Sequence, residues 1–402
     1  MSRIAALSTQ APLMSVPGAE CPPGGQGEWF RGAGGLRLRV GFWAPEGPAR
    51  GTVFVSPGRA EPIEKYYETV RDLLARDFAV VAHDWRGQGL SARLLSERLK
   101  GHARTTDEFM DDFGRLLDAF EDRAPKPWLM LGHSMGAAIN LLSLIEGETR
   151  IDAAIFSGPM LRIRTGRHSM WAVAFNTRWK VRQGEAPNYV PELFDDPFEH
   201  TFDSNALTSD RVRYERWREQ LFACPHLALG SPTWGWLAFA LDVGDRVMKS
   251  KVLKRLKVPI TLVQAGEDSI VNKAAAKLLS KRLGEARYVE VNASEHEVLM
   301  ETDDKRAVFF AEFEALADRV APRPESWGLA EDGVEPGLHS FTLSEASDGG
   351  LEAIPEAPVV MSDSDESSPV TLTGLGTGVV STAFTTPGFD DPAQDSVTGR
   401  RH

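Results

Sequence analysis

The residues best suited to chemistry in this chain of 402 residues form the run Gly132-His133-Ser134-Met135-Gly136. A strand-like apolar segment, 128–131, precedes the run, and a helix-forming segment, 137–146, follows it. A serine on so tight a strand-to-helix turn has a strained backbone, so the residues two positions away on either side must be small. Gly132 and Gly136 meet that demand. We predict that Ser134 is a nucleophile whose hydroxyl points out above the carboxyl edge of a sheet, where ligands of open α/β sheets bind.

A serine hydroxyl needs a base to take its proton, and histidine is the usual base because its pKa lies near neutrality. Only one of the nine histidines, His296, follows the last expected strand in a loop, 292–297. The others lie in the elbow, at a strand end, in a polar loop, in the stretch 160–247 or near the C-terminus: His133, His83, His102, His168, His200, His226, His339 and His402. Triads built on this elbow run in the order Ser, acid, His. We therefore predict His296 as the base.

The acid that orients the histidine must lie between Ser134 and His296 in the chain. Asp268 follows an expected strand through a short loop, and its neighbour Glu267 is the rival candidate. Carboxylates at loop tips are often only solvated, so position alone leaves both residues open.

Acyl transfer also requires backbone N–H groups directed at the developing oxyanion. One should come from Met135, the residue after the nucleophile. We place the second at Arg59, in the loop 56–61, where Gly58 lets the backbone approach closely. The alternative for this loop is a simple strand-to-helix turn.

The elements that must position these residues alternate between strand and helix. Expected strands are 52–55, 78–82, 128–131, 153–156, 260–264 and 288–291, and expected helices are 63–75, 107–121, 135–146, 273–283 and 304–316. One expected helix carries an apolar stripe at spacings of four, three and four: Phe109, Phe113, Leu116 and Phe120. Such alternation predicts an α/β fold, a mostly parallel sheet with helices on both faces.

The alternation defines four regions. We expect a flexible N-terminal arm over 1–27, an α/β domain over 28–320, and within it an inserted helical lid over about 160–247. The lid holds five of the ten tryptophans, Trp171, Trp179, Trp217, Trp234 and Trp236, for which an acyl-chain pocket and ordinary packing are both open readings. Residues 321–402 are rich in Pro, Gly, Ser, Thr, Asp and Glu, so we expect a disordered acidic tail.

Charge and cysteine content exclude several classes. The formal net charge is −12, and 321–402 carries 14 acidic residues against three arginines, so the rest of the chain is near neutral. Without a basic face, we expect no nucleic-acid partner. Two cysteines, Cys21 and Cys224, give neither a disulfide framework nor metal-ligand spacing, so we expect no metal and no organic cofactor.

The sequence shows no secretory signal and no membrane span. We therefore expect a cytoplasmic protein that contacts lipid only transiently, at the inner membrane face. No signal bears on its oligomeric state.

Six ordered blocks, spread over roughly Trp29 to Ala317, resemble the lysophospholipase and monoacylglycerol lipase branch of the α/β-hydrolases. They are 58–61 with Lys65-Tyr66; 84–91; the elbow 132–136; Gly266-x-Asp268-x-x-Val271; His296-Glu297; and 205–210 with Arg213-Tyr214 and 230–233. The resemblance implies the α/β-hydrolase fold and favours Asp268 as the acid. One block departs: this chain has Pro57-Gly58 where many relatives have His-Gly.

The expected function is hydrolysis of a small lipid or other ester by Ser134, His296 and Asp268 through an acyl-enzyme, as in a lysophospholipase or a monoacylglycerol lipase. The same triad would also serve another bond, such as a thioester, an amide or a carbon–carbon bond, or an acyltransferase. A non-catalytic binding module of this fold is the alternative from another class, and it would be expected to lack a triad member. An epoxide hydrolase or dehalogenase is disfavoured, because its elbow would carry Asp at position 134.

Overall fold

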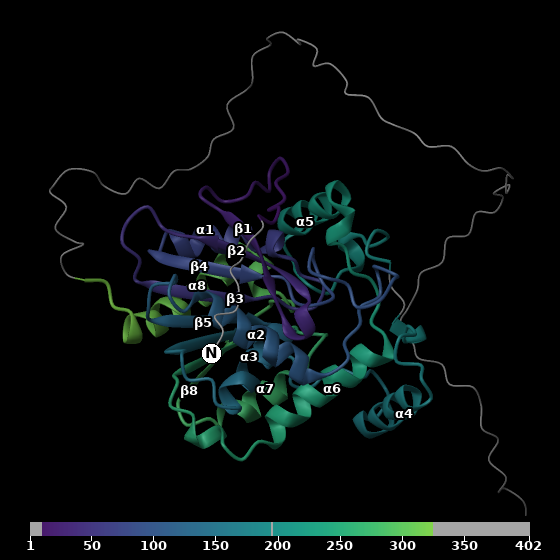
Figure 1. The fold of residues 1–402 in the computed structure, drawn as a ribbon. Helices are drawn as coiled ribbons and strands as arrows, with labels where there is room; N and C mark the ends of the chain where they lie inside the picture. Colours follow the sequence, from purple (N-terminus) through teal and green to yellow (C-terminus); the bar gives the residue numbers. More distant parts are fainter. Residues whose placement is uncertain (1–9, 194–195, 325–402) are drawn as a thin grey trace, which may run out of the picture. The chain divides into compact units, whose positions relative to one another are not determined.

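The computed structural model describes residues 10–193 and 196–324, and a single sheet lies at its centre (Figure 1). The strand order is β1-β2-β4-β3-β5-β6-β7-β8. The strands are β1 (Gln26–Arg31), β2 (Arg37–Trp43), β3 (Gly51–Ser56), β4 (Phe78–His83), β5 (Trp128–His133), β6 (Ala153–Ser157), β7 (Ile260–Ala265) and β8 (Ala286–Val291). The β1–β2 and β2–β4 pairs are antiparallel, and every other pair of neighbours is parallel. The mostly parallel sheet predicted from the alternation is confirmed.

Helices cover both faces of this sheet. They are α1 (Tyr67–Leu74), α2 (Thr106–Phe120), α3 (Ser134–Ile145), α4 (Met170–Arg182), α5 (Arg211–Ala223), α6 (Trp234–Lys249), α7 (Lys273–Ser280) and α8 (Asp303–Val320). Successive side chains of a strand point to opposite faces. Accordingly, Val53 and Val55 of β3 pack in the apolar cluster under α1 and α8, whereas Phe54 packs in the cluster under α2, α3 and α7 (Figure 1).

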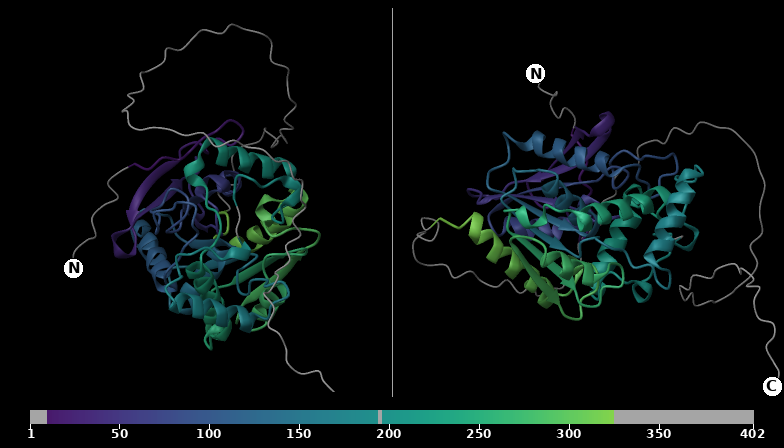
Figure 2. Two further views of the ribbon diagram at one scale, coloured as in Figure 1. Left: turned by 90° about the vertical axis from the view of Figure 1, so that its right-hand side faces the viewer. Right: turned by 90° about the horizontal axis from the view of Figure 1, so that it is seen from below.

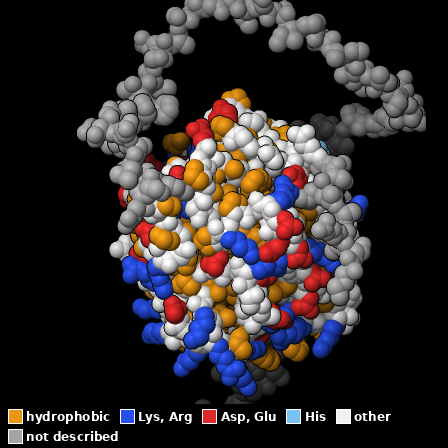
Figure 3. Space-filling view, turned by 60° about the vertical axis from the view of Figure 1, so that its left-hand side comes forward, with side chains coloured by type: hydrophobic (Ala, Val, Ile, Leu, Met, Phe, Trp, Pro, Cys, Tyr) orange, Lys and Arg blue, Asp and Glu red, His pale blue; other side chains and the backbone are white. Residues whose placement is uncertain are grey.

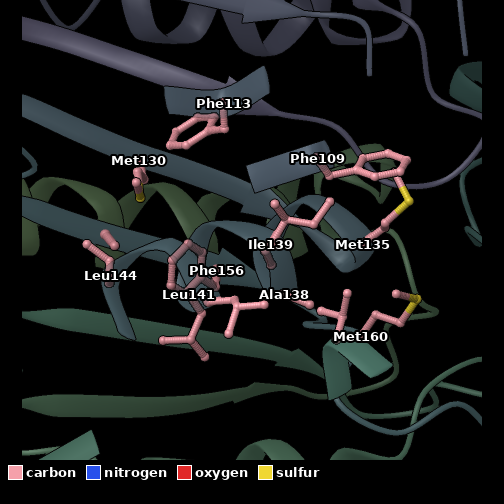
Figure 4. Close-up of a cluster of buried hydrophobic side chains, with 14 of the residues drawn as sticks. Phe109, Phe113, Met130, Met135, Ala138, Ile139, Leu141, Leu144, Phe156 and Met160 are labelled. Carbon is pink, nitrogen blue, oxygen red and sulfur yellow. The ribbon is translucent and has the colours of Figure 1, made fainter. Parts of the chain in front are cut away.

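The apolar stripe expected on α2 lies in the core. Phe109, Phe113, Leu116 and Phe120 are each at most 1% exposed. Figure 4 shows Phe109 and Phe113 above the side chains of α3, with Ile139 between the two helices. Helix α3, which begins at Ser134, is apolar on nearly all sides because it is enclosed by the sheet, α2 and α6.

Between β6 and β7 the chain builds α4, α5 and α6, where a lid was predicted. Helix α6 belongs to the core of the body, because Phe239 stacks on Phe109 of α2 with ring centroids 4.5 Å apart. Helix α4 lies at the lower right of Figure 1 and α5 lies higher up, near α1; in the right-hand view of Figure 2 the teal stretch that holds both helices lies to the right of the sheet.

The five tryptophans of this stretch divide into two groups. Trp217, Trp234 and Trp236 are at most 9% exposed, so ordinary packing accounts for them. Trp171 and Trp179 of α4 are 76% and 47% exposed. Trp171 stacks on Phe175, one turn along the same helix, with centroids 5.6 Å apart.

The arm expected over 1–27 packs against the body for as far as it is described. The Ala11 N–H donates to the Gly27 carbonyl, the Arg39 guanidinium to the Pro12 carbonyl and the Trp43 indole to the Pro22 carbonyl. Backbone pairing and apolar contacts therefore place residues 10–27 on the sheet, in contrast to a free arm. Residues 1–9 and nearly all of the acidic tail expected over 321–402 lie outside the described residues.

The described part of the chain shows no membrane-spanning helix, and one of its faces carries mixed charges (Figure 3). Within residues 10–193 and 196–324, no helix has the length and apolar character needed to cross a membrane. On the face drawn in Figure 3, basic and acidic side chains are intermingled, with apolar side chains between them.

Candidate active site

The elbow has the strained geometry that its glycines suggest. Ser134 joins β5 to α3 with a φ of +47°, in the left-handed region that side chains with a Cβ rarely adopt. A Cβ on Gly132 would lie 2.7 Å from the Ala137 Cα, and one on Gly136 would lie 2.2 Å from the Ser56 carbonyl oxygen. Both glycines are therefore required by backbone contacts, and the start of α3 lies directly on the end of β3.

The residues predicted as nucleophile, base and acid meet at one place. The Ser134 Oγ lies 3.0 Å from the His296 Nε2, and the His296 Nδ1 lies 2.8 Å from the Asp268 Oδ2. The three residues come from the ends of β5, β7 and β8, which are parallel and so end at the same edge of the sheet. Ser134 is 8% exposed, and His296 and Asp268 are each 3% exposed.

Asp268 and its rival Glu267 have opposite environments. Asp268 is buried, and its Oδ1 accepts the N–H groups of Ile270 and Val271, each at 2.9 Å. Its Oδ2 accepts the Gln264 Nε2–H at 2.8 Å as well as the His296 Nδ1–H. Glu267 is exposed and takes no part in these contacts.

These contacts determine the protonation states at the site. Burial acts to raise the pKa of Asp268, but the His296 imidazole and the N–H groups of Val271 and Ile270 lower it, and the net pKa lies below the ordinary value of 3.8. An ionised Asp268 holds the proton of His296 on Nδ1, which leaves the Nε2 lone pair facing the serine hydroxyl. This is the tautomer that can accept the proton of Ser134.

The loop 56–61, here called the oxyanion loop, has its N–H groups largely committed. The Gly58 N–H donates to the Glu61 Oε2 at 2.5 Å, and the Ala60 N–H donates to the Gln88 Oε1 at 2.8 Å. Arg59, the predicted second donor, lies between these two residues in the loop. The Met135 side chain is buried beside Phe109, which fixes the first residue after the nucleophile (Figure 4). The roles of Arg59 and Met135 as oxyanion donors stay predictions.

The turn 84–91, quoted above as a family block, holds the oxyanion loop. The Trp85 Nε1–H donates to the Pro57 carbonyl at 2.8 Å, and the Gln88 Nε2–H to the Gly58 carbonyl at 3.3 Å. The buried Asp84 accepts the Ile63 N–H at 3.0 Å, just beyond the loop. These contacts hold the conformation of the oxyanion loop, which begins with Ser56 and Pro57.

Sequence reasoning missed Gln264, which orients Asp268. Five further polar residues are buried behind the elbow: Glu61, Lys65, Tyr66, His133 and Glu297. All five lie within the family blocks and the elbow named above, but sequence reasoning gave none of them a role at the site. Across the described ranges, no three His, Cys, Asp or Glu side chains are arranged to hold a metal ion.

Comparisons with known proteins identify a family and several relatives. The family described as serine aminopeptidase, S33 matches residues 47–303, which include Ser134, Asp268 and His296. Lysophospholipase L2 of Escherichia coli K12 is 30% identical over 276 residues, which are 64% of this chain and 77% of that protein. The monoacylglycerol lipase of Mycolicibacterium smegmatis is 26% identical over 279 residues, which are 69% of this chain and 91% of that protein.

A solved structure is also similar in fold. It is a soluble variant of monoglyceride lipase from Saccharomyces cerevisiae in complex with a substrate analogue, with a TM-score of 0.58 and 17% identity, and the match covers 73% of this chain and 94% of that one. At this identity the likeness concerns the fold alone.

Proposed function

Because this chain belongs to the serine aminopeptidase S33 family and is a serine hydrolase of the α/β-hydrolase fold, similar to lysophospholipases and monoglyceride lipases, we propose that it hydrolyses the ester of a monoacyl lipid. The substrate class is a lysophospholipid or a monoacylglycerol. The observation that carries the proposal is the pair of hydrogen-bond contacts joining Ser134 to His296 and His296 to Asp268, at 3.0 and 2.8 Å.

In the first half of the reaction, the Ser134 Oγ attacks the ester carbonyl while the His296 Nε2 takes the hydroxyl proton. The carbonyl oxygen becomes an oxyanion, which the N–H groups of Met135 and Arg59 stabilise. Asp268 stabilises the imidazolium that forms. The tetrahedral intermediate then collapses, the ester C–O bond breaks, and His296 gives its proton to the leaving glycerol-type alcohol.

In the second half, His296 accepts a proton from water as the water oxygen attacks the acyl-enzyme carbonyl. Collapse of the second intermediate breaks the bond to the Ser134 Oγ, which regains a proton from His296. The second half thus converts the acyl-enzyme and one water molecule into a carboxylic acid and the free enzyme, without any cofactor.

The choice of a monoacyl lipid rests on the relatives and on the surface of α4. Lysophospholipase L2 of E. coli and the M. smegmatis monoacylglycerol lipase bear names that specify lipids with one acyl chain. The exposed Trp171, Phe175 and Trp179 recur every four residues along α4. We expect these rings to contact a lipid surface. The transient membrane contact and the cytoplasmic location stay predictions.

The test is a substrate panel assayed with the parent protein, Ser134→Ala and the control Ser143→Ala. Ser143 lies on the same helix, α3, and its hydroxyl donates to the Asn140 carbonyl at 2.7 Å, away from the triad. The panel contains a lysophosphatidylcholine, a monoacylglycerol, nitrophenyl butyrate, a thioester and an aminoacyl nitroanilide. The fatty acid released is quantified together with any acylated alcohol.

We expect release of fatty acid from one of the two lipids, a loss of roughly 10⁵-fold or more in Ser134→Ala, and near-parental activity in Ser143→Ala. If the protein cleaves only the thioester or only the anilide, it is a hydrolase of that bond and the ester assignment is wrong. Formation of acylated alcohol in place of free acid would make the protein a transferase. Equal activity in the parent and Ser134→Ala would remove Ser134 as the nucleophile.

A further inference from the structure

Behind the triad lies a group of charged and polar side chains that the mechanism above does not use. Glu61, Lys65, Tyr66, His133 and Glu297 are between 3% and 8% exposed. We call these five residues the buried cluster. Burying charge is costly unless each group is paired and hydrogen-bonded, so such a cluster needs an explanation.

The contacts of the buried cluster join three loops that each hold a catalytic group. The Glu61 Oε2 accepts the Gly58 N–H of the oxyanion loop at 2.5 Å, the Tyr66 hydroxyl at 2.6 Å and the His133 Nδ1–H at 3.0 Å. His133 immediately precedes Ser134, and its Nε2 lies 3.4 Å from the main-chain carbonyl oxygen of His296.

Lysine completes the cluster. The Lys65 ammonium lies 2.6 Å from the Glu297 Oε1 and 3.2 Å from the Glu61 Oε1. Glu297 follows His296 in the chain, so this ion pair ties the histidine loop to the oxyanion loop a second time. With His133 charged, the cluster contains two cations and two anions.

The surroundings of His133 determine its protonation by geometry. Its Nδ1 faces a carboxylate oxygen and its Nε2 faces a carbonyl oxygen, and both of these atoms only accept hydrogen bonds. A neutral imidazole has one N–H, so either tautomer would leave a ring lone pair directed at an acceptor. Only the doubly protonated ring donates at both ends.

The electrostatics agree with this geometry. Burial lowers the pKa of His133, but the Glu61 and Glu297 carboxylates together raise it by more, so the net pKa lies above the ordinary value of 6.5. Burial acts to raise the pKa of Glu61, yet His133 and Lys65 hold that pKa well below the ordinary value of 4.5. The charged and titratable groups facing His133 are Glu61, Lys65, Glu297 and His296, whose ring centroid lies 4.9 Å from that of His133.

We propose that Glu61 and a protonated His133 form a buried ion pair that positions the oxyanion loop and His296 relative to Ser134. This proposal rests on the proposed function for its catalytic consequence, although the charge on His133 does not depend on it. Neither residue touches the reacting atoms, so both are positioning residues. The pair sets the place of Gly58 on one side and of the His296 main chain on the other.

Enclosure makes this arrangement sensitive to the loss of either partner. A cavity of about 10 Å³, which is room for about one water molecule, is lined by the buried cluster together with Thr69, Leu299 and Met300. Water can therefore do little to compensate a lost charge. A displacement of about 1 Å in a catalytic group can lower a rate by roughly 100-fold.

The first arm of the test measures the protonation of His133 in the inactive Ser134→Ala protein by ¹⁵N NMR of the histidine rings. The signal is assigned by its absence from Ser134→Ala/His133→Gln. We expect both ring nitrogens of His133 to be protonated at pH 7. This arm needs no activity, so it separates failure of the inference from failure of the proposed function.

The second arm measures kcat and KM on the ester that the parent hydrolyses, with Glu61→Gln, His133→Gln and the control Glu64→Gln. Glu64 is also buried, but its carboxylate accepts hydrogen bonds from Arg39, at 2.6 and 2.7 Å, and from the Met14 N–H, at 3.0 Å, instead of from the buried cluster. We expect kcat to fall roughly 10- to 100-fold in Glu61→Gln and His133→Gln with KM within about twofold. Glu64→Gln should lose thermal stability and keep its kcat.

Two results would overturn the inference. One is a His133 ring with a single proton at pH 7 in the first arm. The other is a kcat in folded Glu61→Gln and His133→Gln that equals the kcat of Glu64→Gln, because loss of a buried charge would then matter only for stability. If the parent hydrolyses nothing on the panel, the NMR arm alone decides the state of the ion pair.

Discussion

At the scale of single residues, two adjacent carboxylates have different environments, and the site depends on the buried one, Asp268. Asp268 accepts four hydrogen bonds, and Glu267, its neighbour, lies in solvent. The backbone N–H groups and Gln264 fix both oxygens of Asp268, so the carboxylate orients His296 and carries little freedom of its own.

Asp268→Asn therefore tests the acid with almost no change in volume. An amide would present its NH₂ or its oxygen to His296 without a charge, which favours the wrong imidazole tautomer. We expect kcat to fall by roughly 10⁴-fold, as in other triads. The matched control is Glu267→Gln, which should stay within about twofold of the parent. Comparable losses in both variants would show that Asp268 is not the acid.

At the scale of elements, the tight β5–α3 turn is possible because Gly132 and Gly136 have no Cβ and allow close backbone contacts. The Gly136 position lies against the carbonyl oxygens of Ser56 and Pro57, at 2.2 and 2.5 Å from the site of an added Cβ. At a position with open space and an ordinary φ, the same residue type is only a cost in conformational entropy. Gly114 in the middle of α2 has no atom within 4 Å of an added Cβ.

Gly136→Ala and Gly114→Ala should therefore change stability in opposite directions. We expect the free energy of unfolding to fall by about 1–3 kcal/mol in Gly136→Ala, because main chain must move, and kcat to fall with it. In Gly114→Ala it should rise by about 0.5–1 kcal/mol, with kcat unchanged. Urea unfolding and the ester assay measure the two quantities. A stable, active Gly136→Ala protein would contradict the close packing of the elbow on β3.

At the scale of the described molecule, ion pairs join α5, one helix of the stretch between β6 and β7, to the body. The Glu68 carboxylate of α1 lies 2.6 Å from the Arg213 guanidinium of α5 and also pairs with Arg216. Arg213 donates in addition to the Glu301 carbonyl near the histidine loop, at 2.9 Å. One carboxylate thus links α5 to the helices that flank the site.

Acid should loosen this attachment. Burial acts to raise the pKa of Glu68, but Arg213, Arg306 and Arg216 lower it to about 2, from an ordinary value of 4.5. A carboxylate with a lowered pKa in the fold contributes stability above pH 4.5, and the contribution is lost as the pH falls from 4.5 toward 2. The melting temperature of Glu68→Gln should therefore lie below that of the parent at pH 7 and approach it at pH 3.

The control for that series is Glu219→Gln, an exposed glutamate on α5. It should melt with the parent at both pH values. A gap between the parent and Glu68→Gln that is as wide at pH 3 as at pH 7 would mean that packing, and not charge, holds α5 to α1.

Sequence alone determined those features that arise from local rules. Alternation of strands and helices predicted the sheet, and the stripe from Phe109 to Phe120 predicted the buried face of α2, because burial imposes a period on neighbouring residues. The strained elbow pointed to Ser134, and chain order pointed to His296. Parallel strands end at one edge, so these two residues could be expected to meet.

Tertiary structure alone decided the features that depend on partners far apart in the chain. The family resemblance favoured Asp268 over Glu267, but only the tertiary structure shows which of these two adjacent carboxylates is buried against His296, because no sequence period distinguishes them. The division of the tryptophans between packed and exposed likewise depended on where α4 and α6 lie. The buried cluster joins Glu61 to His133 and Lys65 to Glu297, separated by 72 and 232 residues. Local propensity carries no information on such pairs, because their energy exists only once the fold has brought the two charges together.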